Sequence, residues 1–256
     1  MNYKRNPLLY CVAFSDNGAT LSYFRGIEKS AEKVNTRVRQ EILKGKSIKD
    51  TITFIESLNH ESDVDGIIIS RPLPLGFQKK GIKDIIDPVK DVDCVTDENL
   101  GRLITGDFKY IPPTPGAVME IIKEFRIETE GKNTIILGRS DVVGKPLAML
   151  LLQKGVDTTI TICHSKTRSL SSYTRTADIL ITAIGRPKFL KSDMVRPGSV
   201  VIDVGINVKD GKLVGDIDFE DVNRVASMVT PTPGGVGPVT TYILLLNVAK
   251  AASSKQ

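Results

Sequence analysis

The feature that most constrains this chain of 256 residues is a series of short apolar runs that alternate with helical patterns. Most runs are continuously apolar, which is typical of strands buried on both faces of a parallel sheet. Strand–helix alternation of this kind predicts an α/β fold with a mostly parallel sheet. We expect strands at residues 8–14, 65–70, 134–137, 159–164, 179–184, 200–204 and 227–229, and helices at 19–35, 48–58, 117–125, 145–154 and 239–252.

A proline cluster divides the chain near its middle. Pro112, Pro113 and Pro115 stand within four residues, and such a cluster cannot continue a helix or a central strand. Two expected strands precede it and a fuller βα series follows. We therefore expect two domains: residues 1–115, onto which a C-terminal helix at 239–256 packs back, and a doubly wound domain at 116–238.

Composition excludes several classes of protein. The longest uncharged stretch, residues 225–249, is interrupted by prolines and glycines, and what remains is shorter than the ~20 residues that a membrane span needs. The net charge of +5 is scattered, without a basic stripe interleaved with aromatic residues, so we expect no nucleic-acid partner. Three cysteines and two histidines lack metal-site spacing, so we expect no metal; such sparse thiols fit a reducing cytoplasm.

A glycine turn between an expected strand and helix is the first candidate for a nucleotide site. Gly138, Arg139 and Ser140 follow the strand, and Gly144 opens the helix. In doubly wound sheets a phosphate binds at this point, against free N–H groups and the positive end of the helix. The spacing differs from G-x-G-x-x-G, and a glycine beside one strand end more often marks only a turn.

The end of the next expected strand bears on the choice of cofactor. An acidic residue there favours the free 2′-hydroxyl of NAD, whereas hydroxyl or basic residues accommodate the 2′-phosphate of NADP. This sequence has Ser165 and Lys166 and no acid, and Arg139 can reach the same place. We therefore expect NADP and keep NAD as the alternative. His164 is interpreted as a hydrogen-bonded structural histidine in preference to a catalytic one.

Glycine or proline also follows each of the later expected strands. Such loops keep side chains away and let the backbone approach a flat ring, and in open sheets ligands lie over the carboxyl ends of the strands. One loop of this kind means little, but three at successive strand ends indicate a binding site. The candidate residues are Gly185, Gly205, Ile206, Asn207, Pro233, Gly234, Gly235 and Gly237.

These segments together resemble the methylenetetrahydrofolate dehydrogenase/cyclohydrolase family. The resemblance runs in order from about residue 8 to residue 249, through the segments 65–69, 72–74, 90–93, 99–103, 112–115, 138–146, 163–167, 201–207 and 230–238. It implies a catalytic domain joined to a Rossmann-type NADP domain, with folate in a cleft between them, and a homodimer. It also implies hydride transfer from methylenetetrahydrofolate to NADP, and it adds Thr114, Val143 and Thr167 to the expected cofactor contacts.

Within the first domain, the resemblance assigns the folate contacts. Asp93 matches the family's pterin-binding aspartate, and a carboxylate can accept hydrogen bonds from pterin N–H groups. Tyr23 matches an active-site tyrosine that lies alongside the substrate. Without the resemblance, Asp93 would be read as a turn or cap residue and Tyr23 as a half-buried aromatic. The remaining expected substrate contacts are Pro72, Leu73, Pro233, Gly234 and Gly235.

Two positions depart from the family's pattern. The lysine that serves the cyclohydrolase reaction, four residues after the tyrosine, is Ile27 here, and its supporting glutamine is Ser70. Isoleucine cannot transfer a proton, so we expect weak or absent cyclohydrolase activity beside an intact dehydrogenase. The alternatives are a fully bifunctional enzyme and a non-catalytic folate- or nucleotide-binding module. The family also usually has a helical segment of some thirty residues before the first strand, which starts here at about residue 8.

Overall fold

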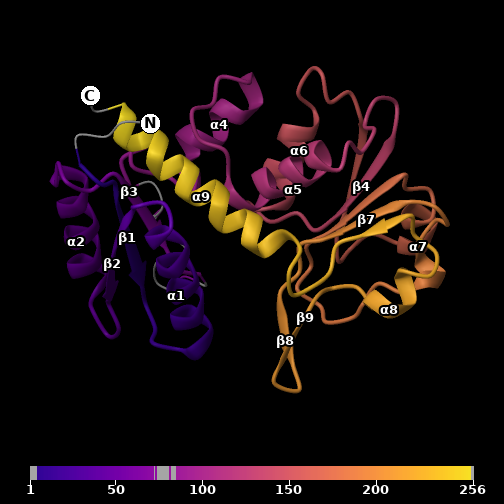
Figure 1. The fold of residues 1–256 in the computed structure, drawn as a ribbon, viewed down its shortest axis with the longest axis horizontal. Helices are drawn as coiled ribbons and strands as arrows, with labels where there is room; N and C mark the ends of the chain where they lie inside the picture. The colour runs from indigo at the N-terminus through magenta and orange to yellow at the C-terminus, as the bar shows by residue number, and fades with distance from the viewer. Residues whose placement is uncertain (1–4, 72, 74–80, 82–84, 255–256) are drawn as a thin grey trace. The chain divides into compact units, whose positions relative to one another are not determined.

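The computed structural model describes residues 5–71, 73, 81 and 85–254. The chain divides into two compact units, which are described separately: residues Met1–Pro113 with Thr241–Gln256, and residues Thr114–Thr240 (Figure 1). The long C-terminal helix α9, Val236–Ser253, begins in the second unit and continues into the first. Both units contain a parallel sheet, so the expected α/β fold class is confirmed.

The first unit is built on a three-stranded parallel sheet in the order β2-β1-β3. The central strand β1, Leu8–Ala13, and β3, Gly66–Ile69, are the two strands expected from their apolar runs. Between them in the chain lie helix α1, Gly18–Glu32, strand β2, Arg37–Ile42, and helix α2, Ile48–His60. The expectation of two strands here was wrong, because β2 is a largely exposed edge strand without an apolar run.

A helix that the apolar pattern did not predict follows the β3 region. Helix α4, Asp97–Thr105, begins at Thr96, whose hydroxyl accepts a hydrogen bond from the Asn99 amide. Acidic Asp97 and Glu98 occupy its first turn, where their negative charges are attracted by the positive end of the helix dipole. The helix ends at Gly106, which adopts the left-handed conformation. Only Asn99 and Leu103 of this helix are buried, which is too few for a clear apolar period.

The second unit contains a five-stranded parallel sheet in the order β10-β7-β6-β4-β5. Apolar residues from both sides of β4, β6 and β7 enter two separate clusters, one packed with α5 and α6 and the other with α7 and α8. Burial on both faces explains the continuous apolar runs. The elements are α5 Pro113–Glu124, β4 Asn133–Leu137, α6 Gly144–Leu151, β5 Thr159–Cys163, α7 Leu170–Thr174, β6 Ile179–Thr182, the 3₁₀ turn η2 Ser192–Met194, β7 Val200–Asp203, α8 Phe219–Val222 and β10 Met228–Val229.

Two further sequence expectations need correction in the second unit. Helix α5 starts inside the proline cluster, at Pro113 rather than at residue 117, because the first turn of a helix leaves its N–H groups unpaired and tolerates proline. The antiparallel hairpin of β8, Asn207–Lys209, and β9, Lys212–Val214, was missed. Its turn residues Asp210 and Gly211 both have positive φ, an Asp-Gly signal that the apolar pattern did not include.

Candidate functional site

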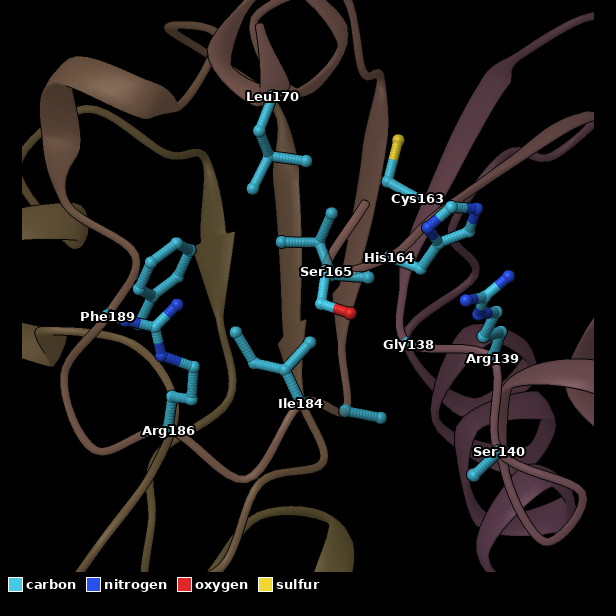
Figure 2. A pocket seen from close by; sticks show the side chains of 12 residues that line it. Gly138, Arg139, Ser140, Cys163, His164, Ser165, Leu170, Ile184, Arg186 and Phe189 are labelled. Carbon is cyan, nitrogen blue, oxygen red and sulfur yellow. The ribbon is translucent and has the colours of Figure 1, made fainter. Parts of the chain in front are cut away.

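A pocket opens in the second unit at the carboxyl ends of β4, β5 and β6. The cavity measures about 280 Å³, and Figure 2 shows its lining. Arg139 and His164 lie close together on one side, while Arg186 and Phe189 lie on the other, with Ser165 between them. The cavity is lined by Leu137, Gly138, Arg139, Ser140, Cys163, His164, Ser165, Leu170, Ala183, Ile184, Arg186 and Phe189. The loops after three successive strands thus meet at one place.

The turn between β4 and α6 can form only with glycine at two positions. Gly138 has a φ of 121°, and a Cβ there would collide with the carbonyl oxygen of Ala183. A Cβ at Gly144 would collide with the carbonyl oxygen of Gly138. The turn is also fastened internally, because the Val143 amide donates to the Ser140 hydroxyl at 3.1 Å. This close crossing of strand end and helix start provides the backbone cradle that a dinucleotide phosphate requires.

The four expected cofactor contacts in the turn after β5, residues 164–167, have different roles in the structure. The His164 amide donates to the Thr167 hydroxyl at 2.9 Å, and the Thr167 amide donates back to the His164 carbonyl. The Lys166 amide donates to Nδ1 of His164 at 3.2 Å. His164 and Thr167 therefore hold the turn, which supports the structural interpretation of His164. Ser165 lines the cavity, whereas the exposed Lys166 does not.

The wall after β6 was only partly anticipated. Sequence reasoning singled out Gly185 in this loop but missed Ile184, Arg186 and Phe189, which line the pocket. The guanidinium of Arg186 lies 4.2 Å from the centroid of the Phe189 ring, so the pair forms a flat cationic surface. The only signal in the sequence for these residues was that their loop directly follows the expected strand that became β6. The described residues that line the cavity include two arginines and no carboxylate, which favours an anionic ligand.

A second, smaller cavity lies at the ends of β7 and β10 in the same unit. It measures about 200 Å³ and is bounded by two loops, residues 203–206 and 231–238, and by Leu213. The loops bring together the expected contacts Gly205, Ile206, Pro233, Gly234, Gly235 and Gly237. Among the other expected contacts, the Asn207 amide group donates to Asp216, and Thr114 lies half-buried in the first turn of α5.

In the first unit, the residues of the Lys90–Asp93 motif have different tasks. The buried Lys90 donates from Nζ to the Leu58 and Glu61 carbonyls, at the end of α2. The fully buried Asp91 carboxylate accepts hydrogen bonds from the start of α4, namely from the Val95 and Thr96 amides, the Thr96 hydroxyl and the Asn99 side chain. These two residues join α2 and α4 to the turn and leave Asp93 as the half-buried carboxylate of the motif.

Asp93 and Tyr23 both have a raised pKa, and the charge of Asp93 contributes to the shift of Tyr23. Burial, reinforced by the negative charge of Asp91 and opposed by Arg71, raises the pKa of Asp93 to about 6. Burial and then the charge of Asp93 raise the pKa of Tyr23, so its hydroxyl stays protonated at neutral pH. Within the described part of the chain, no group donates a hydrogen bond to the Asp93 carboxylate, which can therefore accept one from a ligand.

The two positions that depart from the family pattern are Ile27 and Ser70. Ile27 lies one turn after Tyr23 on α1 and is completely buried, whereas Tyr23 is 44% exposed. Ser70 is half-buried directly after β3, and its amide donates to the Val12 carbonyl at 2.8 Å. Of the expected contacts beyond Ser70, Leu73 packs against the apolar core of the unit, and Pro72 lies outside the described residues.

Two family models cover most of the chain. Residues 112–256 match the tetrahydrofolate dehydrogenase/cyclohydrolase NAD(P)-binding domain, and residues 1–93 match the catalytic domain of the same family. The chain therefore belongs to the tetrahydrofolate dehydrogenase/cyclohydrolase family, as the sequence resemblance indicated. Within the described residues, no group of three or more metal-ligating side chains is close enough to hold an ion. No helix in that part of the chain is long and apolar enough to cross a membrane.

Relatives of known identity extend this result. The "bifunctional protein FolD" of Salinibacter ruber is 43% identical over 97% of this chain and 86% of its own length. The bifunctional methylenetetrahydrofolate dehydrogenase/cyclohydrolase of Thermoplasma acidophilum has a TM-score of 0.91 and 39% identity, covering 98% of this chain and 90% of its own. The Trypanosoma brucei enzyme, solved with NADP and an inhibitor, has a TM-score of 0.92 and 32% identity, covering 98% and 88%. The NAD(P)-binding domain and this neighbour together support NADP as the cofactor.

Proposed function

We propose that this chain is an NADP-dependent methylenetetrahydrofolate dehydrogenase in which the cyclohydrolase activity of the family is weak or absent. Membership of the family carries the first part of the proposal. The completely buried Ile27, one helical turn from Tyr23 where the family has its lysine, carries the second part. The family resemblance also leads us to propose a cytoplasmic homodimer, which cell fractionation and analytical ultracentrifugation test.

The cavity at the carboxyl ends of β4, β5 and β6 fits the adenosine part of NADP. The glycine turn at Gly138 and Gly144 offers backbone N–H groups to the pyrophosphate, as in other doubly wound sheets. Arg139 and Ser165 line the same cavity and suit the 2′-phosphate, since a guanidinium can bind phosphate through two hydrogen bonds. Among the described lining residues, none has a carboxylate that would repel that phosphate or bind the ribose hydroxyl of NAD.

The smaller cavity fits the nicotinamide part. Its walls are largely backbone, from Gly205 on one loop and Gly234, Gly235 and Gly237 on the other, so a flat ring can approach closely. When bound, NADP supplies the hydride acceptor, and the protein contributes alignment of the donor carbon and the ring. The remaining expected contacts, Thr114, Val143, Thr167 and Asn207, are proposed to support this alignment indirectly.

Asp93 and Tyr23 are proposed to hold the folate. At neutral pH the Asp93 carboxylate is mostly ionised, since its pKa of about 6 lies below the solution pH, and it accepts hydrogen bonds from pterin N–H groups. Tyr23 keeps its proton and presents a partly exposed ring beside the substrate. Neither group has to move a proton in the dehydrogenase reaction, because the hydride leaves the methylene carbon directly.

Hydrolysis of the methenyl product has different requirements. Activation of water needs a group that can take up a proton, and loss of a general acid or base typically removes a factor of ~10²–10⁴. Ile27 cannot take up a proton, and the guanidinium of Arg71, the residue after Ser70, makes a poor base. The two reactions share one folate site but respond differently to the loss of the lysine. Hydride transfer continues, while the rate of hydrolysis falls towards the spontaneous rate.

A spectroscopic assay of the purified protein tests this function. Methylenetetrahydrofolate and NADP are mixed with the enzyme, and NADPH and the methenyl compound are followed at their separate absorbance bands. We expect NADPH to appear together with accumulating methenyl compound. If the methenyl compound disappears faster than it does in enzyme-free buffer, the protein is a bifunctional enzyme like its named relatives. If NADP binds but no NADPH appears, a folate- or nucleotide-binding module is the better description.

A further inference from the structure

Asp216 is a buried carboxylate that lines neither of the two cavities proposed for NADP but contacts residues in the walls of both. It is 0% exposed. Its Oδ2 accepts hydrogen bonds from the Ile184 and Gly185 amides at 2.7 and 3.1 Å, and its Oδ1 accepts one from the Arg186 amide at 2.8 Å. Three consecutive backbone N–H groups thus converge on one side chain, and two of their residues, Ile184 and Arg186, line the cavity at the ends of β4, β5 and β6.

The same carboxylate also reaches the loop beside the smaller cavity. The Asn207 side chain donates to Oδ1 of Asp216 at 2.9 Å. Gly205, which lines that cavity, packs so closely on Asp216 that a Cβ at this glycine would collide with the carboxylate. On the sheet side, the buried Thr182 hydroxyl donates to Oδ2 at 3.0 Å. Asp216 therefore ties together the end of β6, the loop after it and the loop after β7.

We propose that Asp216 is a positioning residue that holds the two halves of the dinucleotide site in their binding arrangement. This inference rests on the proposed NADP site. Ile184 and Arg186 line the cavity proposed for the adenosine part, and residues 203–206 form one wall of the cavity proposed for the nicotinamide. A common anchor keeps both walls ordered before NADP binds, so that binding does not have to order them. An uncharged side chain could fill the same space, but it could not accept five hydrogen bonds.

The choice of a charged residue supports positioning over packing. Burying a carboxylate is costly unless its hydrogen-bonding capacity is met, and here it is met almost entirely by loop groups that have no partner within a sheet. Asp216 is itself held by a second buried aspartate, since its amide donates to Asp203 at 3.1 Å. Asp203 also accepts the Gly205 amide at 2.9 Å. The anchor therefore has little freedom to shift.

The test is the substitution Asp216→Asn, read by calorimetric binding of NADP and of 2′,5′-ADP, which occupies only the adenosine half. An amide can accept at one atom only, so some loop N–H groups lose their partner. We expect Kd for both probes to rise about tenfold or more. The matched control is Asp178→Asn at the other end of β6, where the carboxylate accepts the Asn133 amide and pairs with Arg196. This control should lower the unfolding temperature without changing either Kd.

A lowered unfolding temperature with unchanged Kd values in Asp216→Asn would overturn the proposal and leave Asp216 a stability residue. If that variant does not fold, Thr182→Val removes one bond to Asp216 without touching a pocket-lining residue. Its Kd for 2′,5′-ADP should rise about threefold, and Thr182→Ser should restore the wild-type value. An unchanged Kd in Thr182→Val would equally overturn it. None of these measurements reads turnover, so a wild-type protein that binds NADP without forming NADPH refutes the proposed activity alone.

Discussion

The two units build their candidate sites from different materials. In the second unit the site consists mainly of backbone at the ends of parallel strands, where Gly138, Gly144 and Gly205 allow close approach. In the first unit it depends on a few side chains, above all Tyr23 and Asp93. A backbone site is lost only when its turns are distorted. A side-chain site can lose one reaction through one substitution, which is what we propose for the position of Ile27.

Each unit also contains an aspartate whose pKa burial raises to about 6, and the two have different surroundings. The Asp203 carboxylate accepts hydrogen bonds from the Gly205, Asp216 and Ile217 amides, so its capacity is used within the fold. The Asp93 carboxylate has no donor among the described residues. The same shift in pKa therefore accompanies a structural role in one unit and, we propose, a ligand-binding role in the other.

The sharpest test of the comparison is Asp93→Asn. Losing the charge weakens at least two hydrogen bonds to the pterin, so kcat/KM for methylenetetrahydrofolate should fall roughly a hundredfold. The Kd for NADP, measured by calorimetry, should stay unchanged because that ligand uses the other unit. Asp63→Asn, at an exposed carboxylate paired with Arg37, is the control and should leave kcat/KM intact. A variant Asp93→Asn with near-normal kcat/KM would remove this residue from the folate site.

A gain of function tests the side-chain site from the other direction. The double variant Ile27→Lys, Ser70→Gln restores both family residues and should accelerate hydrolysis of the methenyl compound by about tenfold to a hundredfold. The buried position of Ile27 makes some loss of stability inevitable. Ile27→Met with Ser70→Gln is therefore the matched control, because it changes the same positions without adding an amine. Equal hydrolysis by both double variants would show that the lysine position does not limit this reaction.

In the second unit, Arg139→Ala should change cofactor preference more than activity. Removing the guanidinium that we assign to the 2′-phosphate should reduce the ratio of kcat/KM for NADP to that for NAD about tenfold. Arg224→Ala, at an exposed arginine outside both cavities, serves as the control. If the ratio does not change, the flat pair of Arg186 and Phe189 becomes the better candidate for the phosphate contact.

The last expected effect, also about tenfold, is a pH dependence. The pKa of Asp93 is raised to about 6, so the carboxylate is ionised above that pH and loses its charge as the pH falls through it. The KM for methylenetetrahydrofolate should therefore rise about tenfold for each pH unit below 6. Steady-state kinetics between pH 5 and pH 8 would show a bend near pH 6 in the plot of KM against pH, with an order-of-magnitude change in KM below it. Asp93→Asn should give a profile without it; a bend that persists in this variant assigns the titration to another group.

The sequence was most informative where local pattern alone decides structure. Strands buried on both faces need continuous apolar residues, so β4, β6 and β7 could be placed from their runs. The edge strand β2 and the hairpin β8–β9 could not, because exposed strands carry no such pattern. For the site, the glycine turns were recognised, but Arg186 and Phe189 were not, because neither residue has a distinctive local signature.

Within the motif at residues 90–93, the sequence alone did not separate ligand-binding from structural residues. All four residues match the family, yet Lys90 donates a hydrogen bond to the end of α2 and Asp91 accepts one from α4. Both tasks depend on segments far away in the chain or on a helix that the apolar pattern missed. Only the folded structure leaves Asp93 as the carboxylate without a donor among the described residues.

The sequence by itself determined the α/β class, the strands of the second sheet and the glycine turns, because these features depend on residues that are adjacent in the chain. Only the tertiary structure decided which side chains act together. Asp216 accepts hydrogen bonds from residues 182–186, which lie about thirty positions earlier in the sequence, and burial together with the charge of Asp93 raises the pKa of Tyr23. Such pairs form only when folding brings distant segments together, and a buried carboxylate then accepts hydrogen bonds from the donors that surround it.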